Sequence, residues 1–143
     1  DCLLSRGLGD VYKRQVVEET MILPDEAKAL KAQLIRLADG RQVNLILTTG
    51  GTGFSPRDIT PEATCAVADR NAPGIAEAMR YHSLSITPRG MLSRGVSVLR
   101  GKTLIVNLPG SPKAVQENLE YILPSLEHGV RIAAGLDGEC ARK

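Results

Sequence analysis

The first half of the chain alternates short apolar runs with a longer segment of helical periodicity. Residues Val16–Leu23 form a run of β-branched and apolar residues, which is typical of a strand. Over Asp25–Asp39 the apolar residues recur every three or four positions, which predicts a helix with Asp25 as its N-cap and Gly40 at its end. Val43–Thr48 is nearly continuously apolar, as in a strand buried on both faces. This order predicts a β-α-β unit, and hence parallel strands with a right-handed crossover.

The second half of the chain predicts two helices, two strands and a final helix. Thr60 followed by Pro61 is a strong helix-start signal, with Thr60 as the expected N-cap and a helix of about ten residues after it. The remaining elements are expected over residues 73–83, 96–99, 103–108 and from 113 onward. Because only residues 100–102 separate the two strands, they predict a hairpin or two closely following strands.

Composition places the chain among globular proteins with one domain. It has 143 residues, of which 43% are hydrophobic and 24% charged, and a formal net charge of +2. The charges are scattered, which argues against a nucleic-acid partner. The apolar runs are far shorter than the roughly 20 residues that cross a bilayer, so no membrane partner is expected. The amino terminus has no apolar signal core, and the cytoplasm is therefore the expected location.

Two loops that follow strands carry the candidate chemistry, Thr48–Asp58 and Asn107–Ser111. Ligands of open α/β sheets bind at the carboxyl ends of parallel strands, so the two loops are candidates for one site. Thr49–Gly53 reads TGGTG, and glycines allow successive backbone N–H groups to approach an anion such as a phosphate. An ordinary tight turn explains the same glycines equally well. Neither a dinucleotide fingerprint nor a P-loop pattern is present.

Two aspartates are candidates for metal or catalytic roles. Asp58 follows the glycine loop, and a carboxylate beside a phosphate cradle suggests an intervening Mg²⁺. The alternative is that Asp58 caps the turn or the helix that begins near Thr60. Asp25 has the same two interpretations, with the N-cap role sufficient to explain it.

The other polar residues give weaker evidence for a functional site than the two aspartates. Ser93 and Arg94 could reach a phosphate, although single exposed residues of these types often have no specific role. Ser111 is the expected N-cap of the last helix, which makes the second loop an ordinary connection unless other signals are added. His82 and His128 have no triad or metal partner at a useful spacing, so covalent catalysis has little support.

One long run, Leu45–Thr64, reads LILTTGGTGFSPRDITPEAT, and further distinctive segments are Pro73–Arg80, Met91–Gly95 and Gly101–Pro112. Together these segments closely resemble the molybdopterin adenylyltransferases, the family that includes the amino-terminal domain of gephyrin. The resemblance covers about residues 16–135, and the long signature is highly specific.

The resemblance implies an α/β fold, a three-layer α/β/α sandwich with a mostly parallel sheet, that is usually trimeric. It implies ATP and molybdopterin as substrates and Mg²⁺ as cofactor, in a reaction that adenylylates molybdopterin and releases pyrophosphate. Asp58 matches the family's essential aspartate, with Mg²⁺ as its implied ligand, and Asp25 matches a second functional aspartate. The implied binding residues are Thr49, Gly50, Gly51, Thr52 and Gly53 in the first loop, with Ser93, Pro109, Gly110 and Ser111 elsewhere.

The chain departs from the family at its front. Residues 1–15 match neither the family's first strand nor its first helix, and we interpret them as a non-native leader on a truncated domain of residues 16–135, followed by a loose tail over 136–143. Two functions from different classes follow: an adenylyltransferase, or a catalytically silent homologue that binds molybdopterin.

Overall fold

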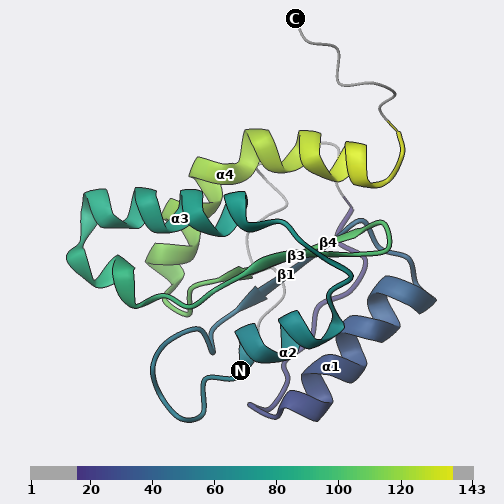
Figure 1. The fold of residues 1–143 in the computed structure, drawn as a ribbon, viewed down its shortest axis with the longest axis horizontal. Coiled ribbons are helices and arrows are strands. Elements are labelled where there is room, and N and C mark those ends of the chain that lie inside the picture. The colour runs from purple at the N-terminus through teal and green to yellow at the C-terminus, as the bar shows by residue number, and fades with distance from the viewer. Residues whose placement is uncertain (1–15, 137–143) are drawn as a thin grey trace, which may run out of the picture.

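The fold comes from a computed structural model, in which residues 16–136 are described. Figure 1 shows three layers, with a sheet between two pairs of helices. The predictions for residues 1–15 and 137–143 concern parts of the chain outside those described. In chain order the elements are α1 (Ala27–Ile35), η1 (Arg36–Gly40), β1 (Leu45–Thr49), α2 (Thr60–Val67), β2 (Arg70–Asn71), α3 (Pro73–Ile86), η2 (Pro88–Leu92), β3 (Ser97–Arg100), β4 (Thr103–Leu108) and α4 (Pro112–Ala133).

The sheet is mixed, with strand order β1-β4-β3-β2. β1 and β4 are parallel, with Leu45 opposite Leu104, whereas β3 runs antiparallel to both of its neighbours. The expectation of a mostly parallel sheet is corrected here, because β3 and β4 form the hairpin that the sequence offered as one option. Gly101 has φ +54° in its turn, and so short a connection can join only antiparallel strands.

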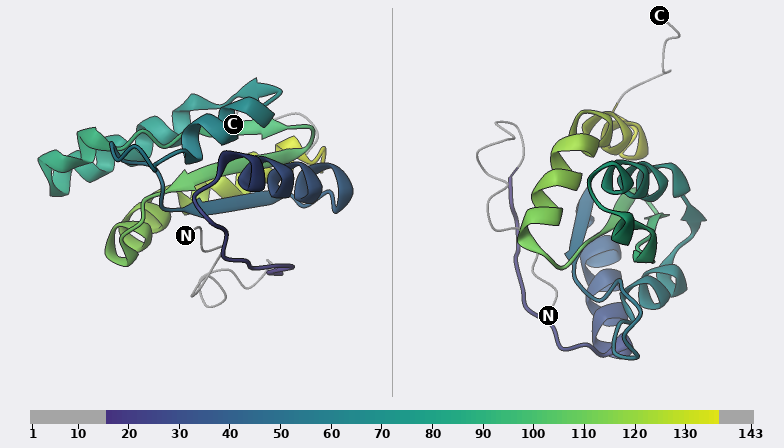
Figure 2. Two further views of the ribbon diagram at one scale, coloured as in Figure 1. Left: turned by 90° about the horizontal axis from the view of Figure 1, so that it is seen from below. Right: turned by 90° about the vertical axis from the view of Figure 1, so that its left-hand side faces the viewer.

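The three-layer α/β/α architecture is confirmed by two separate cores. α3 and α4 cover one face of the sheet, and α1 and α2 cover the other (Figures 1 and 2). β4 is buried along its whole length, with Leu104 and Val106 in the core under α3 and α4, and Ile105 in the core over α1 and α2. Each such side chain contributes about 1.5–3 kcal/mol by leaving water, so the central strand fixes both layers.

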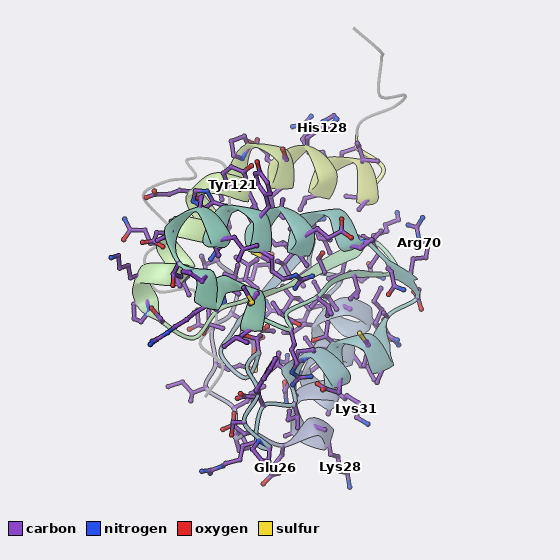
Figure 3. All side chains as sticks on the ribbon, turned by 60° about the vertical axis from the view of Figure 1, so that its left-hand side comes forward. Glu26, Lys28, Lys31, Arg70, Tyr121 and His128 are labelled. Atoms are coloured by element: carbon purple, nitrogen blue, oxygen red, sulfur yellow. The ribbon has the colours of Figure 1, made fainter. Side chains whose placement is uncertain are left out.

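The N-caps of α1 and α2 differ from the predicted ones by one position. The N-cap of α1 is Glu26 rather than Asp25, and its side chain makes no capping hydrogen bond. Figure 3 shows Glu26 and Lys28 projecting outward from this end of the helix. The N-cap of α2 is Ile59, and Thr60 is the first residue of the helix; the N–H of Thr60 donates to the carbonyl of Gly51 at 3.2 Å.

The helix ends also differ from the predicted ones. α2 ends at Val67, where a longer helix was predicted, because the chain leaves it to pair Arg70 and Asn71 with β3. α3 starts at Pro73 as predicted and continues to Ile86, one turn beyond the expected end.

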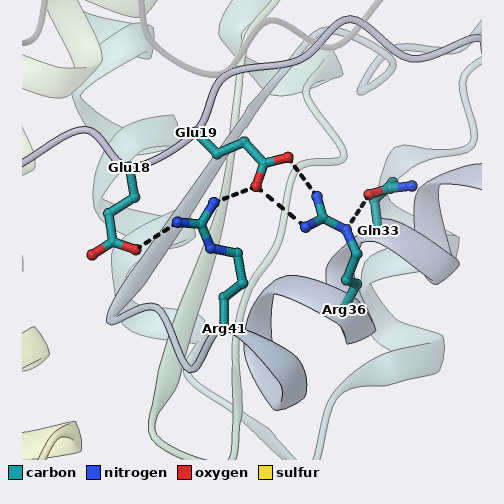
Figure 4. Close-up of polar contacts among 5 residues, drawn as sticks. All are labelled: Glu18, Glu19, Gln33, Arg36 and Arg41. Atoms are coloured by element: carbon teal, nitrogen blue, oxygen red, sulfur yellow. Dashed lines mark hydrogen bonds and ion pairs between the residues drawn. The ribbon is translucent and has the colours of Figure 1, made fainter.

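The predicted strand Val16–Leu23 is wrong: these residues are extended but belong to no sheet. Figure 2 shows them running along the outside of the molecule as a strap. Met21 and Leu23 pack against the core beneath α1, and Glu19 accepts hydrogen bonds from Arg36 and Arg41, each as short as 2.6 Å (Figure 4). The alternation that indicated a strand therefore reflects side-chain packing. A strand also needs a neighbouring strand with which its backbone can form hydrogen bonds. Among residues 16–136 the strand that pairs with β1 is β4, and Val16–Leu23 pair with no strand.

We expect the strap to hold less tightly in acid. The hydrogen bonds from Arg36, and then from Arg41, lower the pKa of Glu19 below its usual value of 4.5. A lowered pKa means that the contact stabilises the folded state above about pH 4.5 and is lost as the pH falls through the lowered pKa. Glu19→Gln should therefore reduce the melting temperature at pH 7 and change it little at pH 3.

The control for this prediction is Glu18→Gln, since among residues 16–136 Glu18 pairs with Arg41 alone, at 3.3 Å, and it is more exposed than Glu19. Circular-dichroism melts of both variants at the two pH values provide the measurement. An equal loss for Glu19→Gln at pH 7 and pH 3 would show that its charge does not stabilise the strap.

Candidate functional site

The two candidate loops lie against each other where the parallel strands β1 and β4 end. The N–H of Gly50 donates to the carbonyl of Leu108 at 3.2 Å, which continues the β1–β4 pairing by one residue. Gly110 is so close that an added Cβ would lie 3.4 Å from the Cα of Gly50. The structure thus brings together Thr48–Asp58 and Asn107–Ser111, at the edge where ligands of such sheets bind.

The first loop needs glycine at two successive positions. Gly50 has φ +85° and Gly51 has φ +69°, a region that other residues seldom adopt. At Gly51 there is also no room, because an added Cβ would lie 2.2 Å from the hydroxyl oxygen of Thr60. The loop is therefore folded tightly against the first turn of α2.

The backbone of this loop presents its N–H groups in one consecutive run. Three successive carbonyls are occupied: that of Gly51 by the N–H of Thr60 (3.2 Å), and those of Thr52 and Gly53 by the backbone N–H (2.8 Å) and Nε (2.8 Å) of Arg94. The peptide bonds are trans, so each N–H points away from the carbonyl of its own peptide unit. Within residues 16–136, no acceptor binds the N–H groups of Thr52, Gly53 and Phe54. Consecutive N–H groups of this kind form an anion-binding surface.

Asp58 is half-buried and closes the far end of the loop. Its Oδ2 accepts the N–H of Ser55 at 3.0 Å, and its own N–H donates to the carbonyl of Ser55 at 2.9 Å. A Cβ added to Gly53 would lie 2.9 Å from Oδ2, so the glycine leaves space for the carboxylate beside the loop. The carboxylate thus holds the turn of residues 55–58, whereas no side chain caps the start of α2, so only the turn part of the capping interpretation is confirmed. Oδ1 of Asp58 has no hydrogen-bond donor among the described residues.

This arrangement fits a magnesium ion held jointly with a phosphate ligand. Mg²⁺ commonly takes one or two carboxylates from a protein and the rest of its ligands from phosphates and water. Asp58 supplies one such carboxylate beside the run of N–H groups. In residues 16–136 there is no cluster of three or more His, Cys, Asp or Glu side chains that could hold a metal by itself.

The other residues predicted for the site lie in or beside the two loops, at the end of β1, along a small pocket and at the start of α4. Thr49 ends β1, and Thr52 is buried. Ser93 and Pro109 line a small pocket between α3, α4 and the end of β4. Ser111 caps α4 as predicted, since its Oγ accepts the N–H of Ala114 at 3.3 Å.

Asp25 is exposed and precedes α1. The structure places the start of α1 and the glycine loop at the same end of the molecule (Figures 1 and 2).

The match to a family model decides what kind of domain this site belongs to. Residues 13–128 match the family described as "Probable molybdopterin binding domain". The chain belongs to this molybdopterin-binding family. The resemblance drawn from the sequence is thereby confirmed.

Individual relatives agree with this assignment. The molybdopterin adenylyltransferase of Haemophilus influenzae is 52% identical over 104 residues, which are 73% of this chain and 53% of the relative. Gephyrin of Dictyostelium discoideum is 43% identical over 89% of this chain and 18% of its own length. Among solved structures, the molybdopterin biosynthesis enzyme MoaB of Thermus thermophilus has a TM-score of 0.74 and 53% identity, covering 78% of this chain and 70% of that one. The chain spans about half the length of the Haemophilus influenzae and Escherichia coli adenylyltransferases that it matches.

The molybdopterin-binding domain contains a supporting residue that sequence reasoning missed. Asn107, only 1% exposed, donates from Nδ2 to the hydroxyls of Thr48 (2.9 Å) and Thr64 (3.0 Å). Its Oδ1 accepts the N–H of Val96 at 3.1 Å. It therefore ties the end of β4 to β1, α2 and the start of β3. The available signal was a single amide in the apolar run 103–108.

None of the helices in residues 16–136 is both long and apolar enough to cross a membrane.

Proposed function

We propose that this molybdopterin-binding domain acts in molybdenum cofactor biosynthesis as an Mg²⁺-dependent adenylyltransferase. In the reaction, an oxygen of the terminal phosphate of molybdopterin attacks the α-phosphorus of ATP. A new P–O bond forms to that oxygen, the bond between the α-phosphorus and the bridging oxygen breaks, and pyrophosphate leaves. The observation that carries the proposal is the run of unoccupied N–H groups at Thr52, Gly53 and Phe54 beside Asp58, in a chain about 50% identical to proteins named molybdopterin adenylyltransferase.

The N–H groups of Thr52, Gly53 and Phe54 would bind phosphate oxygens without a basic surface. This agrees with a chain whose net charge is only +2. Two helix N-termini add positive potential at the same edge: α2 follows the first loop, and the 22-residue α4 begins directly after Gly110 and Ser111. Thr49, Gly50 and Gly51 shape the loop, while Ser93 and Pro109, which the family resemblance assigns to ligand binding, border the small pocket between α3, α4 and the end of β4.

Asp58 would hold Mg²⁺, which when bound neutralises phosphate charge and favours departure of pyrophosphate. Asp25 is assigned a second catalytic role from the family resemblance. No protein nucleophile is needed, because the phosphate of the substrate itself attacks. Phosphoryl transfer depends mainly on positioning and on charge stabilisation, which this set of groups supplies.

The same proposal covers partners and location. It takes the domain to work as a homotrimer in the cytoplasm, with molybdopterin and ATP as its small-molecule partners, and without a nucleic-acid or membrane partner.

The alternative function is a homologue that binds molybdopterin without catalysis. Two titrations and one assay separate the two functions: calorimetric titration with molybdopterin, titration with Mg·ATP, and pyrophosphate release when both are present. The adenylyltransferase proposal expects binding of both ligands and pyrophosphate release. Binding of molybdopterin with no pyrophosphate release would instead favour the silent homologue.

A further inference from the structure

The side chain of Arg94 joins three parts of the candidate site. It follows η2 and lies 36 to 41 residues from the backbone groups that it contacts. Its Nε donates to the carbonyl of Gly53 at 2.8 Å, and its Nη2 donates to the carbonyl of Asp58 at 2.7 Å. Its Nη1 forms an ion pair with Glu62 in the first turn of α2. One guanidinium thus contacts the middle of the glycine loop, its end, and the helix that follows.

The backbone of Arg94 adds a fourth contact, since its N–H donates to the carbonyl of Thr52 at 2.8 Å. Arg94 therefore occupies two of the three successive carbonyls that set the direction of the loop's N–H groups. Without these contacts, a segment with glycine at positions 50, 51 and 53 has many backbone conformations of similar energy. The contacts are what select the one conformation in which the N–H groups are presented together.

The geometry favours a structural role for Arg94 over direct binding of phosphate. Each of its three side-chain nitrogens already donates an N–H to an oxygen of the protein, so three of the five N–H groups of the guanidinium are used in holding the loop and α2. The hydrogen bond from Arg94 lowers the pKa of Glu62, so this carboxyl keeps its charge, and the ion pair persists, further into acid than for an unpaired glutamate.

We propose that Arg94 is a positioning residue for adenylyl transfer, which holds the glycine loop and Asp58 in the geometry that accepts the phosphates. This inference rests on the proposed function. It requires the planar fork of arginine, because lysine has the same charge but carries all its donors on one nitrogen, which cannot reproduce three spread contacts to Gly53, Asp58 and Glu62.

The test uses ¹⁵N NMR on the whole chain with Arg94→Gln, Arg94→Lys and the control Arg89→Gln. Arg89 is exposed on η2, five residues before Arg94, and its loss removes the same charge without touching the loop. Heteronuclear NOEs of the amides of residues 51–54 report order without ligand. Titration with inorganic pyrophosphate in the presence of Mg²⁺ reports binding. The amide of Ile105, in the centre of β4, verifies that each variant is folded.

Both Arg94 variants should show lower NOEs at residues 51–54 and a pyrophosphate Kd raised about tenfold or more, whereas Arg89→Gln should match the unaltered chain. The inference is overturned if Arg94→Lys keeps the order and affinity of the unaltered chain, since charge alone would then suffice. It is also overturned if Arg94→Gln behaves as Arg89→Gln does. If the unaltered chain has an ordered loop but does not bind pyrophosphate, the proposed function fails and the inference about Arg94 does not. In that case the NOEs without ligand still decide whether Arg94 orders the loop.

Discussion

Asp58→Asn should leave the fold intact and lower the rate of adenylyl transfer by about 100-fold or more, the typical cost of removing one electrostatic group from an active site. Asparagine has nearly the same shape, and its carbonyl oxygen can still accept the N–H of Ser55, which now lies 3.0 Å from Oδ2 of Asp58. The substitution removes the negative charge of the carboxylate, to which we assign the binding of Mg²⁺. Single-turnover measurement of adenylylated molybdopterin, with a melting curve for each variant, provides the test.

The matched control for this variant is Asp69→Asn. Asp69 also caps a turn through one carboxylate oxygen, which accepts the N–H of Gly101 at 2.7 Å, but it lies in the segment before β2 and outside the candidate site. Its loss should leave turnover unchanged. If Asp58→Asn also left turnover unchanged, the carboxylate of Asp58 would have only the capping role.

Gly51→Ala should abolish pyrophosphate binding and destabilise the domain. The added methyl group would lie 2.2 Å from the hydroxyl oxygen of Thr60, so either the loop or α2 must move. The backbone at φ +69° adds strain, and the two effects together should cost about 1–3 kcal/mol of folding free energy. Urea unfolding measures this loss, and titration with pyrophosphate in the presence of Mg²⁺ measures the loss of binding.

Gly129→Ala is the matched control, since Gly129 lies within α4 and an added Cβ would have no neighbour within 4 Å. This variant should bind pyrophosphate normally and gain roughly 0.5–1 kcal/mol from better helix propensity. Normal pyrophosphate binding by Gly51→Ala would contradict the role assigned to the tight loop.

The features that could be predicted from sequence are those set by local periodicity and turn chemistry. The buried strands β1 and β4 are continuous apolar runs, and α3 and α4 carry start signals at Pro73 and Ser111. The meeting of the two glycine loops followed from the parallel pairing of β1 with β4. These features depend on neighbours in the chain, whereas the predicted β-α-β unit is not formed, because its first strand, Val16–Leu23, joins no sheet.

The features that could not be predicted depend on distant partners. The run Val16–Leu23 has a strand-like pattern, but pairing needs a neighbouring backbone that the pattern does not specify. β2 has two residues, too few for any periodicity, and its pairing ends α2 early. Arg94 is one arginine in a loop, and only folding places it beside carbonyls about 40 residues away. The contacts that hold the glycine loop therefore could not be inferred from the loop's own sequence.

The most direct test of the central claim follows the fate of each phosphate of ATP. The chain is incubated with molybdopterin, Mg²⁺ and ATP that is radiolabelled at either the α- or the γ-phosphorus, and the products are separated. Adenylyl transfer predicts that the α-label moves to molybdopterin while the γ-label appears in pyrophosphate, in equal amounts. If the γ-label moved to molybdopterin, or if the α-label stayed on ATP while molybdopterin bound, the domain would not be an adenylyltransferase.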